Sequence, residues 1–214
     1  MEREAERLQM ISEQLQRRNI RDERVLRAMA AVPRHRFVPR EFDDKAYADN
    51  ALPIAEQQTI SQPYIVALTA AALTLRGDER VLEIGTGSGY AAAVLARLAR
   101  EVWTIERIRP LAQNAAHLLH DLGYRNVHVG IGDGTRGWPD HAPYDAIAVA
   151  AAGPQIPRSL LEQLAIGGRL VIPVGSRDDQ QMIRVVRTPQ GFRDESLGPV
   201  RFVPLVGDEG WNEE

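Results

Sequence analysis

The sequence predicts an α/β protein with a doubly wound, mostly parallel sheet and an N-terminal helical extension. From residue 79 onward, apolar runs of strand length alternate with segments of helical periodicity, and short turns join them. Residues 144–151 are almost continuously apolar, which is typical of a strand buried on both faces of a sheet. A length of 214 residues suits one compact domain, with helices and a polar motif in residues 1–78 and the α/β core in residues 79–214.

The first part of the chain has helical periodicity. Apolar residues recur at spacings of three and four over residues 8–15, and a second helix follows the N-cap residue Asp22. Pro63 opens an apolar helix, because proline suits the first helical turn. We expect this helix to end at residues 77–78.

The strands and helices of the core are predicted from the alternation between strand-like and helix-like patterns of apolar residues. We expect strands over residues 80–84, 101–105, 127–129, 144–151, 169–174, 181–187 and 200–203. We expect helices over residues 90–100, 109–122 and 158–164. The pair Gly167-Gly168 is expected to turn the chain into the strand at 169–174.

Composition excludes several classes of function. The chain has no cysteine, which rules out disulfides, cysteine-ligated zinc, iron–sulfur clusters and thiol catalysis. Its net charge of −3 gives no overall positive field toward nucleic acid or anionic lipid. The N-terminus is charged, and the longest apolar stretch, residues 65–75, is too short to span a bilayer of ~30 Å. We therefore expect a cytoplasmic protein with no nucleic-acid or membrane partner.

A glycine-rich loop follows the strand at 80–84 and opens the next helix. It reads Glu83-Ile84-Gly85-Thr86-Gly87-Ser88-Gly89-Tyr90, and open α/β sheets bind ligands at such carboxyl ends of strands. A structural strand–helix turn would also account for this loop taken alone. Glu106 ends the next strand, where a carboxylate can accept hydrogen bonds from both hydroxyls of a ribose. The alternative for Glu106 is a charge at the start of a surface helix.

The spacing of the glycines discriminates between nucleoside ligands. A dinucleotide loop has glycine at its first, third and sixth positions, and the sixth is Tyr90 here, too bulky for the close helix–strand packing that glycine permits. No Gly-Lys-Ser/Thr follows, which excludes a P-loop. An acidic residue beside the loop, Glu83, suits the ammonium and sulfonium of S-adenosylmethionine. Asp133 is placed to accept from an adenine amino group, unless it serves only an Asp-Gly turn.

Two sets of motifs resemble known families. The core resembles the class I S-adenosylmethionine-dependent methyltransferase fold in its glycine loop, in Glu106 and Asp133, and in residues 144–147 and 167–173. The segment Gln58-Thr59-Ile60-Ser61-Gln62-Pro63-Tyr64 is more discriminating. With residues 32–39, 46–47, 51–54 and 201–205, it resembles the protein-L-isoaspartate O-methyltransferase family, and the resemblance runs from about Leu8 to Trp211.

The resemblance implies an activity. It is the transfer of a methyl group from S-adenosylmethionine to the free carboxylate of L-isoaspartyl residues in damaged proteins and peptides, which initiates their repair. It implies these damaged proteins as the partners, with no obligatory protein partner, and leaves open whether D-aspartyl residues are accepted.

The resemblance also implies roles for individual residues. Ser61 matches the catalytic serine. The cofactor-binding residues would be Gln58, Thr59, Ile60, Glu83, Gly85, Thr86, Gly87, Ser88, Gly89, Glu106, Arg107, Asp133 and Gly134. The substrate-binding residues would be Ile60, Ser61, Tyr64, Val203 and Val206. Tyr64 stands where relatives often have histidine, and Val206 where some have threonine.

The implied reaction needs neither a general base nor a metal. A substrate carboxylate with a pKa near ~3.9 is already ionised at neutral pH. His35 lies in a proline-bounded loop and is interpreted as structural, and His117, His120 and His128 have no metal-ligand spacing. The enzyme would act by alignment and desolvation, with the Ser61 hydroxyl and nearby amides orienting an anion. The alternative for Ser61 is a cap on the helix that Pro63 opens.

Three other functions remain as alternatives. Another class I methyltransferase, acting on a small metabolite or RNA, is disfavoured by the segment at 58–61 and by the lack of a clustered basic and aromatic surface. A non-catalytic cofactor-binding module would bind S-adenosylmethionine without turnover on any isoaspartyl peptide. A nicotinamide oxidoreductase is disfavoured by Tyr90.

Overall fold

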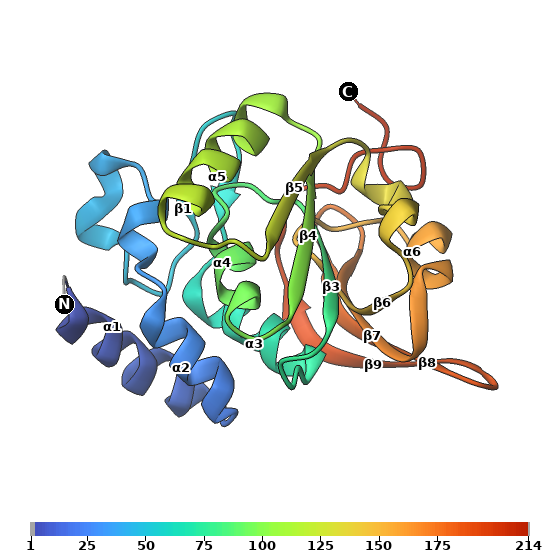
Figure 1. Cartoon of the computed structure of the whole chain (residues 1–214), viewed down its shortest axis with the longest axis horizontal. Coiled ribbons are helices and arrows are strands. Elements are labelled where there is room, and N and C mark those ends of the chain that lie inside the picture. Colours follow the sequence, from blue (N-terminus) through green and yellow to red (C-terminus); the bar gives the residue numbers. More distant parts are fainter. Residues whose placement is uncertain (1–2, 214) are drawn as a thin grey trace.

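The core is a seven-stranded sheet with the strand order β5-β4-β3-β6-β7-β8-β9 (Figure 1). The computed structural model describes residues 3–213, so Met1 and Glu2 of the polar N-terminus and Glu214 lie outside it. Strands β3 to β7 run parallel, whereas β8 and β9 continue the sheet as antiparallel strands. The strand order reverses between β3 and β6, where open α/β sheets bind their ligands. The predicted doubly wound α/β fold is confirmed.

The central strands are apolar because both of their faces are covered. The strands of the sheet are β3 (Arg80–Ile84), β4 (Glu101–Glu106), β5 (Val127–Ile131), β6 (Tyr144–Val149), β7 (Leu164–Gly175), β8 (Gln180–Thr188) and β9 (Gly191–Val200). In β3, Val81, Leu82 and Ile84 are buried, and so is the carboxyl side chain of Glu83. Burying a carboxyl group at this position lowers the stability of the fold unless the group is hydrogen-bonded.

Helices cover the two faces of the sheet unequally. The helices α3 (Pro63–Leu73), α4 (Tyr90–Ala96) and α5 (Arg109–Asp121) lie on one face, and the short α6 (Arg158–Glu162) lies on the other (Figure 1). Pro63 occupies the first turn of α3, as predicted.

The N-terminal extension packs outside α3 and α4. It comprises α1 (Glu4–Met10), which continues in a π-helical turn over Ile11–Leu15 and a 3₁₀ turn over Gln16–Arg18, and then α2 (Glu23–Ala31). Asp22 caps α2, since its Oδ1 accepts a hydrogen bond from the Arg24 backbone N–H at 2.8 Å. The extension therefore adds a helical layer on the α3–α4 side of the sheet.

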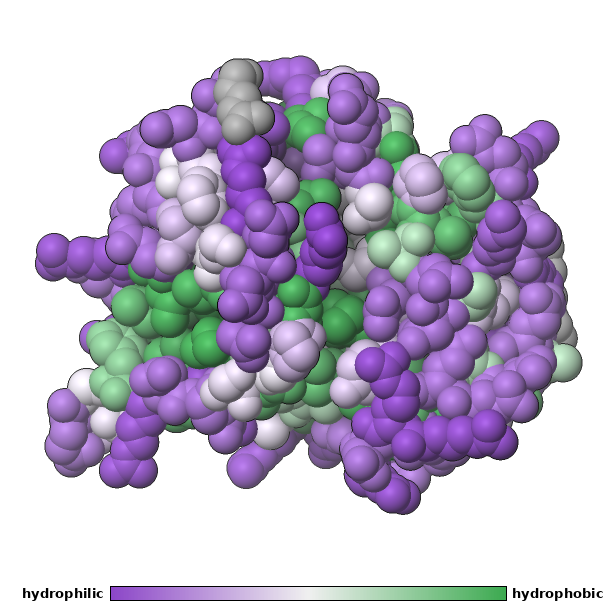
Figure 2. Space-filling model, turned by 180° about the vertical axis from the view of Figure 1, so that it is seen from behind, coloured by the Kyte–Doolittle hydropathy of each residue, from purple (hydrophilic) through white to green (hydrophobic). Residues whose placement is uncertain are grey.

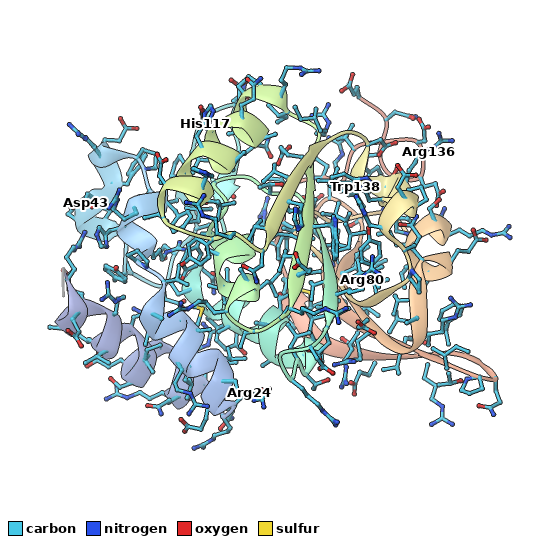
Figure 3. All side chains as sticks on the ribbon, viewed as in Figure 1. Arg24, Asp43, Arg80, His117, Arg136 and Trp138 are labelled. Atoms are coloured by element: carbon cyan, nitrogen blue, oxygen red, sulfur yellow. The ribbon has the colours of Figure 1, made fainter. Side chains whose placement is uncertain are left out.

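Two apolar clusters hold these layers together. The first combines side chains of α1 and α2, such as Met10 and Met29, with α3, α4 and one face of the sheet. The second lies between the opposite face and α6, where Figure 3 shows Trp138 and Arg80. The Trp138 ring lies so close to Gly130 that a Cβ there would be 2.6 Å from it, so this strand position admits no side chain.

Several predicted boundaries are wrong. The helix opened by Pro63 ends at Leu73 instead of residues 77–78, because Thr74 takes a left-handed conformation with φ 50°. The helix at Tyr90 ends at Ala96 instead of residue 100 and continues as turns. Gly167-Gly168 lies inside β7, which begins at Leu164 and accommodates an irregular register between Tyr144 and Ala146.

The last strand is also misplaced in the prediction. We predicted residues 200–203, but β9 covers Gly191–Val200 and forms a hairpin with β8. Most of β9 is exposed on both faces, so it lacks the apolar alternation by which sequence reveals a strand. Residues beyond Val200 make only isolated bridges within the described chain, such as Ala152 with Pro204.

The face of the molecule seen from behind is mostly hydrophilic (Figure 2). On this face, apolar side chains show in gaps between charged ones (Figure 2). Across residues 3–213, no helix has both the length and the apolarity needed to cross a bilayer. Nor do the described residues contain a group of three or more histidine, aspartate or glutamate side chains that could hold a metal ion.

Candidate functional site

A cavity opens at the carboxyl ends of β3, β4 and β6, where the strand order reverses. Four segments far apart in sequence meet there: residues 58–61, the glycine loop, the end of β4 and residues 203–206. The lining residues that the sequence predicted are Gln58, Thr59, Ile60, Ser61, Gly85, Thr86, Gly87, Ser88, Glu106, Arg107, Gly134, Val203 and Val206.

The glycine loop exposes its backbone to this cavity. Gly85, Gly87 and Gly89 have φ values of 91°, 52° and 87°, which other residues rarely adopt. The Gly85 N–H donates to the Ile105 carbonyl at 2.8 Å, which fixes the loop to the end of β4. Gly89 does not line the cavity; a Cβ there would lie 3.2 Å from Leu119 Cδ1, so it allows α4 to pack on α5.

Glu106 joins the loop to the next helix. Its Oε2 accepts from the Gly87 N–H at 2.9 Å and its Oε1 accepts from the Ile108 N–H at 3.0 Å. A carboxylate oxygen has two lone pairs, so each oxygen can accept a further hydrogen bond from a ligand hydroxyl. The buried Glu106 therefore both shapes the cavity and offers it an acceptor.

A short hairpin brings residues 58–61 to the cavity wall. Strand β1 (Leu52–Pro53) pairs with β2 (Thr59–Ile60), and the turn between them holds Glu56 and Gln57 in left-handed conformations with φ 58° and 56°. Such a conformation costs roughly 1–2 kcal/mol for each residue with a Cβ. Strain of this kind is often found at functional sites, and here it accompanies the placement of Thr59 and Ile60 beside the glycine loop.

Ser61 follows β2 directly and does not cap α3. The N-cap residue of α3 is Gln62, and no side chain caps the helix. The alternative of a purely capping serine is therefore wrong. Ser61 lines the large cavity and also a smaller apolar cavity that adjoins it.

The C-terminal tail forms one wall of the cavity. Val203 and Val206 line it as predicted, and the tail is held in place by Asp133 and Glu209. Asp133 Oδ2 accepts from the Asp208 N–H at 2.8 Å, and Glu209 Oε2 accepts from the Ser159 N–H at 3.0 Å. The tail is thus bound to the loop that follows β5 and to the start of α6.

Asp133 itself lies outside the cavity lining, although Gly134 is part of it. Its Oδ1 accepts from the backbone N–H and the hydroxyl of Thr135, at 2.9 and 2.7 Å. Burial tends to raise the pKa of Asp133, but the hydrogen bonds from Asp208 and Thr135, with Arg136 nearby, hold it below its ordinary value. Oδ2 keeps one lone pair for a further donor, and its contact with adenine remains a prediction.

Tyr64 also lies outside the cavity lining. The Arg18 guanidinium stands 3.3 Å from its ring centroid, and Asp49 accepts both from the Tyr64 N–H at 3.1 Å and from Arg18 at 2.7 Å. This places the ring against the N-terminal extension. A substrate contact from Tyr64 remains a prediction.

Glu83 is buried beside the smaller cavity instead of the large one. Its Oε2 accepts from the Thr104 hydroxyl at 2.6 Å, and the hydroxyls of Thr104 and Thr86 are 2.7 Å apart. Burial raises the pKa of Glu83 to about 8, and the neighbouring Glu106 adds to this rise, whereas the hydrogen bond from Thr104 opposes it. In the cofactor-free protein at neutral pH, Glu83 is therefore mostly protonated.

Tyr90 explains why this loop lacks a sixth-position glycine. Its ring is buried and meets the Phe37 ring edge to face at 5.7 Å, with the Arg34 guanidinium 4.7 Å from its centroid. The tyrosine therefore fills the space between α4 and the 3₁₀ turn Arg34–Phe37 that follows α2. Burial raises the pKa of its hydroxyl to about 12, so it is neutral.

Sequence reasoning missed most of the apolar part of the lining, although it predicted Ile60, Val203 and Val206. The residues that it missed are Val66, Ile84, Tyr90, Ala91, Ile105, Ile108, Ala150, Ala151, Pro204 and Leu205. Ile105 and Ile108 flank Glu106, and Ala150 and Ala151 follow β6 at the point of strand reversal, which is the signal that could have identified them. Apolar residues at strand ends otherwise read as ordinary core.

Comparison with known proteins identifies the family. Residues 5–210 match the model of the family described as protein-L-isoaspartate(D-aspartate) O-methyltransferase. The chain belongs to this family. A protein from Rhodopseudomonas palustris (strain HaA2), named protein-L-isoaspartate O-methyltransferase 1, is 59% identical over 209 residues, which are 97% of this chain and 85% of that protein.

Solved structures agree with the family and confirm the predicted class I methyltransferase fold. One protein-L-isoaspartate O-methyltransferase superimposes with a TM-score of 0.86 at 28% identity, covering 95% of this chain and 67% of that one. A Plasmodium falciparum protein described as belonging to the same enzyme class, in complex with S-adenosyl-L-homocysteine, has a TM-score of 0.79 at 24% identity. It covers 94% of this chain and 98% of that one, and shows that the fold extends over almost the whole chain.

Proposed function

We propose that this protein-L-isoaspartate O-methyltransferase transfers the methyl group of S-adenosylmethionine to the free carboxylate of L-isoaspartyl residues, with Ser61 orienting that carboxylate. The observation that carries the proposal is the meeting of the residues 58–61 with the glycine loop and Glu106 around one cavity. Membership of the family, whose name states this activity, supports it.

The residues present fit the cofactor. A Cβ at Gly134 would lie only 2.4 Å from Ile84 Cγ2, and Gly85 and Gly87 have φ values of 91° and 52° that residues with a side chain rarely adopt, so this cradle depends on glycine. Glu106 supplies an acceptor for ribose hydroxyls, and Ile105 and Ile108 supply apolar walls. When bound, S-adenosylmethionine supplies an electrophilic methyl carbon attached to a sulfonium.

The protein contributes alignment and the exclusion of water. A substrate carboxylate is ionised at neutral pH and needs no base to become a nucleophile. The Ser61 hydroxyl is free of any role in capping α3 and can donate to one carboxylate oxygen. Ile60, Val203 and Leu205 enclose the same cavity with apolar surface, which strips water from the anion. Holding two reacting groups in line can contribute ~7–11 kcal/mol.

We also infer the setting in which the enzyme acts. Isoaspartyl-containing proteins and peptides are its partners, with no part for nucleic acid, a membrane or an obligatory protein partner. The cytoplasm is its place of action, which the absence of cysteine favours. D-aspartyl residues would enter the same cavity if their carboxylate reached Ser61.

The test is radiolabelled methyl transfer to a synthetic isoaspartyl peptide and to its normal-aspartyl twin. We expect label in a base-labile ester on the isoaspartyl peptide and almost none on the twin. Binding of S-adenosylmethionine without transfer to either peptide would make the protein a cofactor-binding module. Equal labelling of both peptides would show that the cavity does not discriminate the isoaspartyl backbone.

A further inference from the structure

Glu83 has a buried carboxyl oxygen that is not hydrogen-bonded. Its Oε2 accepts from Thr104 at 2.6 Å, whereas its Oε1 is buried without a hydrogen-bond partner among the described residues. A buried polar oxygen without a hydrogen-bond partner lowers the stability of the fold. The roles proposed above for Glu106 and Ser61 do not involve this oxygen.

The surroundings of Glu83 are almost free of other charges. Helices α3 and α4, strand β6 and Phe202 line its cavity with apolar side chains and Thr69, and Ser61 adds a second hydroxyl. Glu83 is the single titratable residue of this lining. On β4 its neighbours are Thr104 and the carboxylate of Glu106. No cation contributes to the shift of its pKa, so the ionised form has no positive partner in the cofactor-free protein.

The cavity of Glu83 adjoins the reacting centre. It shares Ser61, Val66, Ala91 and Ala150 with the large cavity. Its volume of about 30 Å³ is room for little more than a water, so it does not admit a substrate side chain. If Ser61 orients the substrate carboxylate, the sulfonium of the methyl donor would have to be held close to Ser61, and Ser61 lines the cavity on which Glu83 lies. Charges across an apolar cavity interact more strongly than they would in water.

We propose, on the basis of the proposed function, that Glu83 distinguishes the charged cofactor from its uncharged product by ionising when the sulfonium binds. Its O–H proton leaves to the buffer as S-adenosylmethionine binds, and the carboxylate then faces the sulfonium. After methyl transfer the sulfur is a neutral thioether, so Glu83 takes a proton back. S-Adenosylhomocysteine thereby loses one attraction that S-adenosylmethionine has, which favours release of the product.

The test measures proton exchange and affinity without turnover. S-Adenosylmethionine and S-adenosylhomocysteine are titrated calorimetrically at pH 7 in two buffers of different ionisation enthalpy. Both ligands carry the same amino-acid end, so protons exchanged there cancel in the difference between them. We expect S-adenosylmethionine to release about 0.5–0.9 proton more than S-adenosylhomocysteine at pH 7, and this excess to vanish near pH 9 where Glu83 is already ionised. The ratio of the two dissociation constants should shift in favour of S-adenosylmethionine by about tenfold or more from pH 6 to pH 9.

Two variants test whether Glu83 is the group that releases the excess proton. Glu83→Gln keeps an oxygen for the Thr104 hydroxyl but cannot ionise, and it should abolish both the excess proton release and the pH dependence of the ratio. The matched control is Glu79→Gln, another buried carboxyl, which precedes the opposite end of β3 and accepts from the Arg76 and Gly77 N–H groups. It should retain both effects.

The outcomes separate this inference from the proposed function. Equal proton release by the two ligands would show that the sulfonium does not cause Glu83 to ionise. This result would overturn the inference while leaving the methyltransferase assignment intact. Retention of the excess in Glu83→Gln would overturn it as well. Should Glu83→Gln fail to fold, the comparison of the two ligands at pH 7 and pH 9 decides the question on the unaltered protein. Failure of both ligands to bind would refute the proposed function itself.

Discussion

The carboxylate of Glu106 and the backbone of Gly87 are joined by a hydrogen bond of 2.9 Å between Oε2 and the amide N–H. Because the second oxygen accepts from Ile108, this one side chain fixes the glycine loop relative to α5. The residue predicted to bind the ribose is therefore also a structural element of the cavity.

Glu106→Gln should weaken both cofactor binding and the fold. An amide retains one accepting oxygen, so one of the two backbone N–H groups loses its acceptor, at a cost of ~1–3 kcal/mol. A lower melting temperature and a larger dissociation constant for S-adenosylmethionine are expected, measured by thermal unfolding and calorimetry. An unchanged dissociation constant would show that Glu106 does not contact the cofactor.

Asp133→Asn should release the C-terminal tail. The amide nitrogen of asparagine would face either the Asp208 N–H or Thr135, both of which donate to Asp133. We expect faster hydrogen exchange of the amides in residues 205–211 and weaker binding of S-adenosylmethionine. Arg136→Ala removes an exposed ion pair with Asp208 at 3.2 Å but keeps the hydrogen bonds of Asp133, so it should speed exchange in the tail much less than Asp133→Asn does. Equal exchange in the two variants would contradict the role of Asp133.

The contribution of Glu83 to the free energy of unfolding should fall as the pH rises, because Glu83 is protonated in the folded protein. Its pKa in the folded protein is about 8, above the ordinary 4.5 of the unfolded chain, so the folded state holds a proton that the unfolded state has lost. The contribution of Glu83 to the free energy of unfolding is therefore fully present below about pH 4.5. It declines as the pH rises toward 8, with a limiting slope near 1.4 kcal/mol per pH unit. Above that pH it changes no further.

This dependence is measured as a difference between proteins. Urea unfolding of the unaltered protein and of Glu83→Gln, from pH 5 to pH 9 without cofactor, should show the variant gaining relative stability as the pH rises. A difference that stays constant across this range would mean that Glu83 is ionised throughout.

The nature of the loop predicts the choice of ligand. The sixth position of the loop holds Tyr90, whose ring is buried against Phe37, whereas the dinucleotide pattern has glycine there. Calorimetric titration should show binding of S-adenosylmethionine and none of NAD at the same concentrations. Tight binding of NAD alone would refute the interpretation of the loop.

Much of the fold could be predicted from the sequence because its signals are local. Asp22 and Pro63 start helices through their own chemistry, and the strand around Leu82 is apolar because both faces are covered. Strand β9 escaped prediction because its stability comes from pairing with β8, which leaves no apolar pattern in an exposed strand.

Part of the candidate site could likewise be predicted from local sequence signals, and part could not. The cradle of Gly85 and Gly87 and the position of Glu106 follow from the spacing of residues along the chain. The orientation of Tyr64 toward Arg18 and the anchoring of the tail by Asp133 depend on contacts between distant segments. The same holds for Glu83, which faces a separate cavity, because spacing along one strand does not show which space lies beside a side chain.

The central claim is that Ser61 acts on the reaction and not on the fold. Turnover on an isoaspartyl peptide and the melting temperature are therefore measured together for Ser61→Ala and for Asp22→Ala. Asp22 caps α2 far from the cavity lining, so its replacement should cost about 1 kcal/mol of stability and leave turnover intact. For Ser61→Ala the account predicts the reverse, a loss of turnover by about tenfold or more with an unchanged melting temperature and a similar dissociation constant for S-adenosylmethionine. Intact turnover with a lowered melting temperature in Ser61→Ala would contradict it.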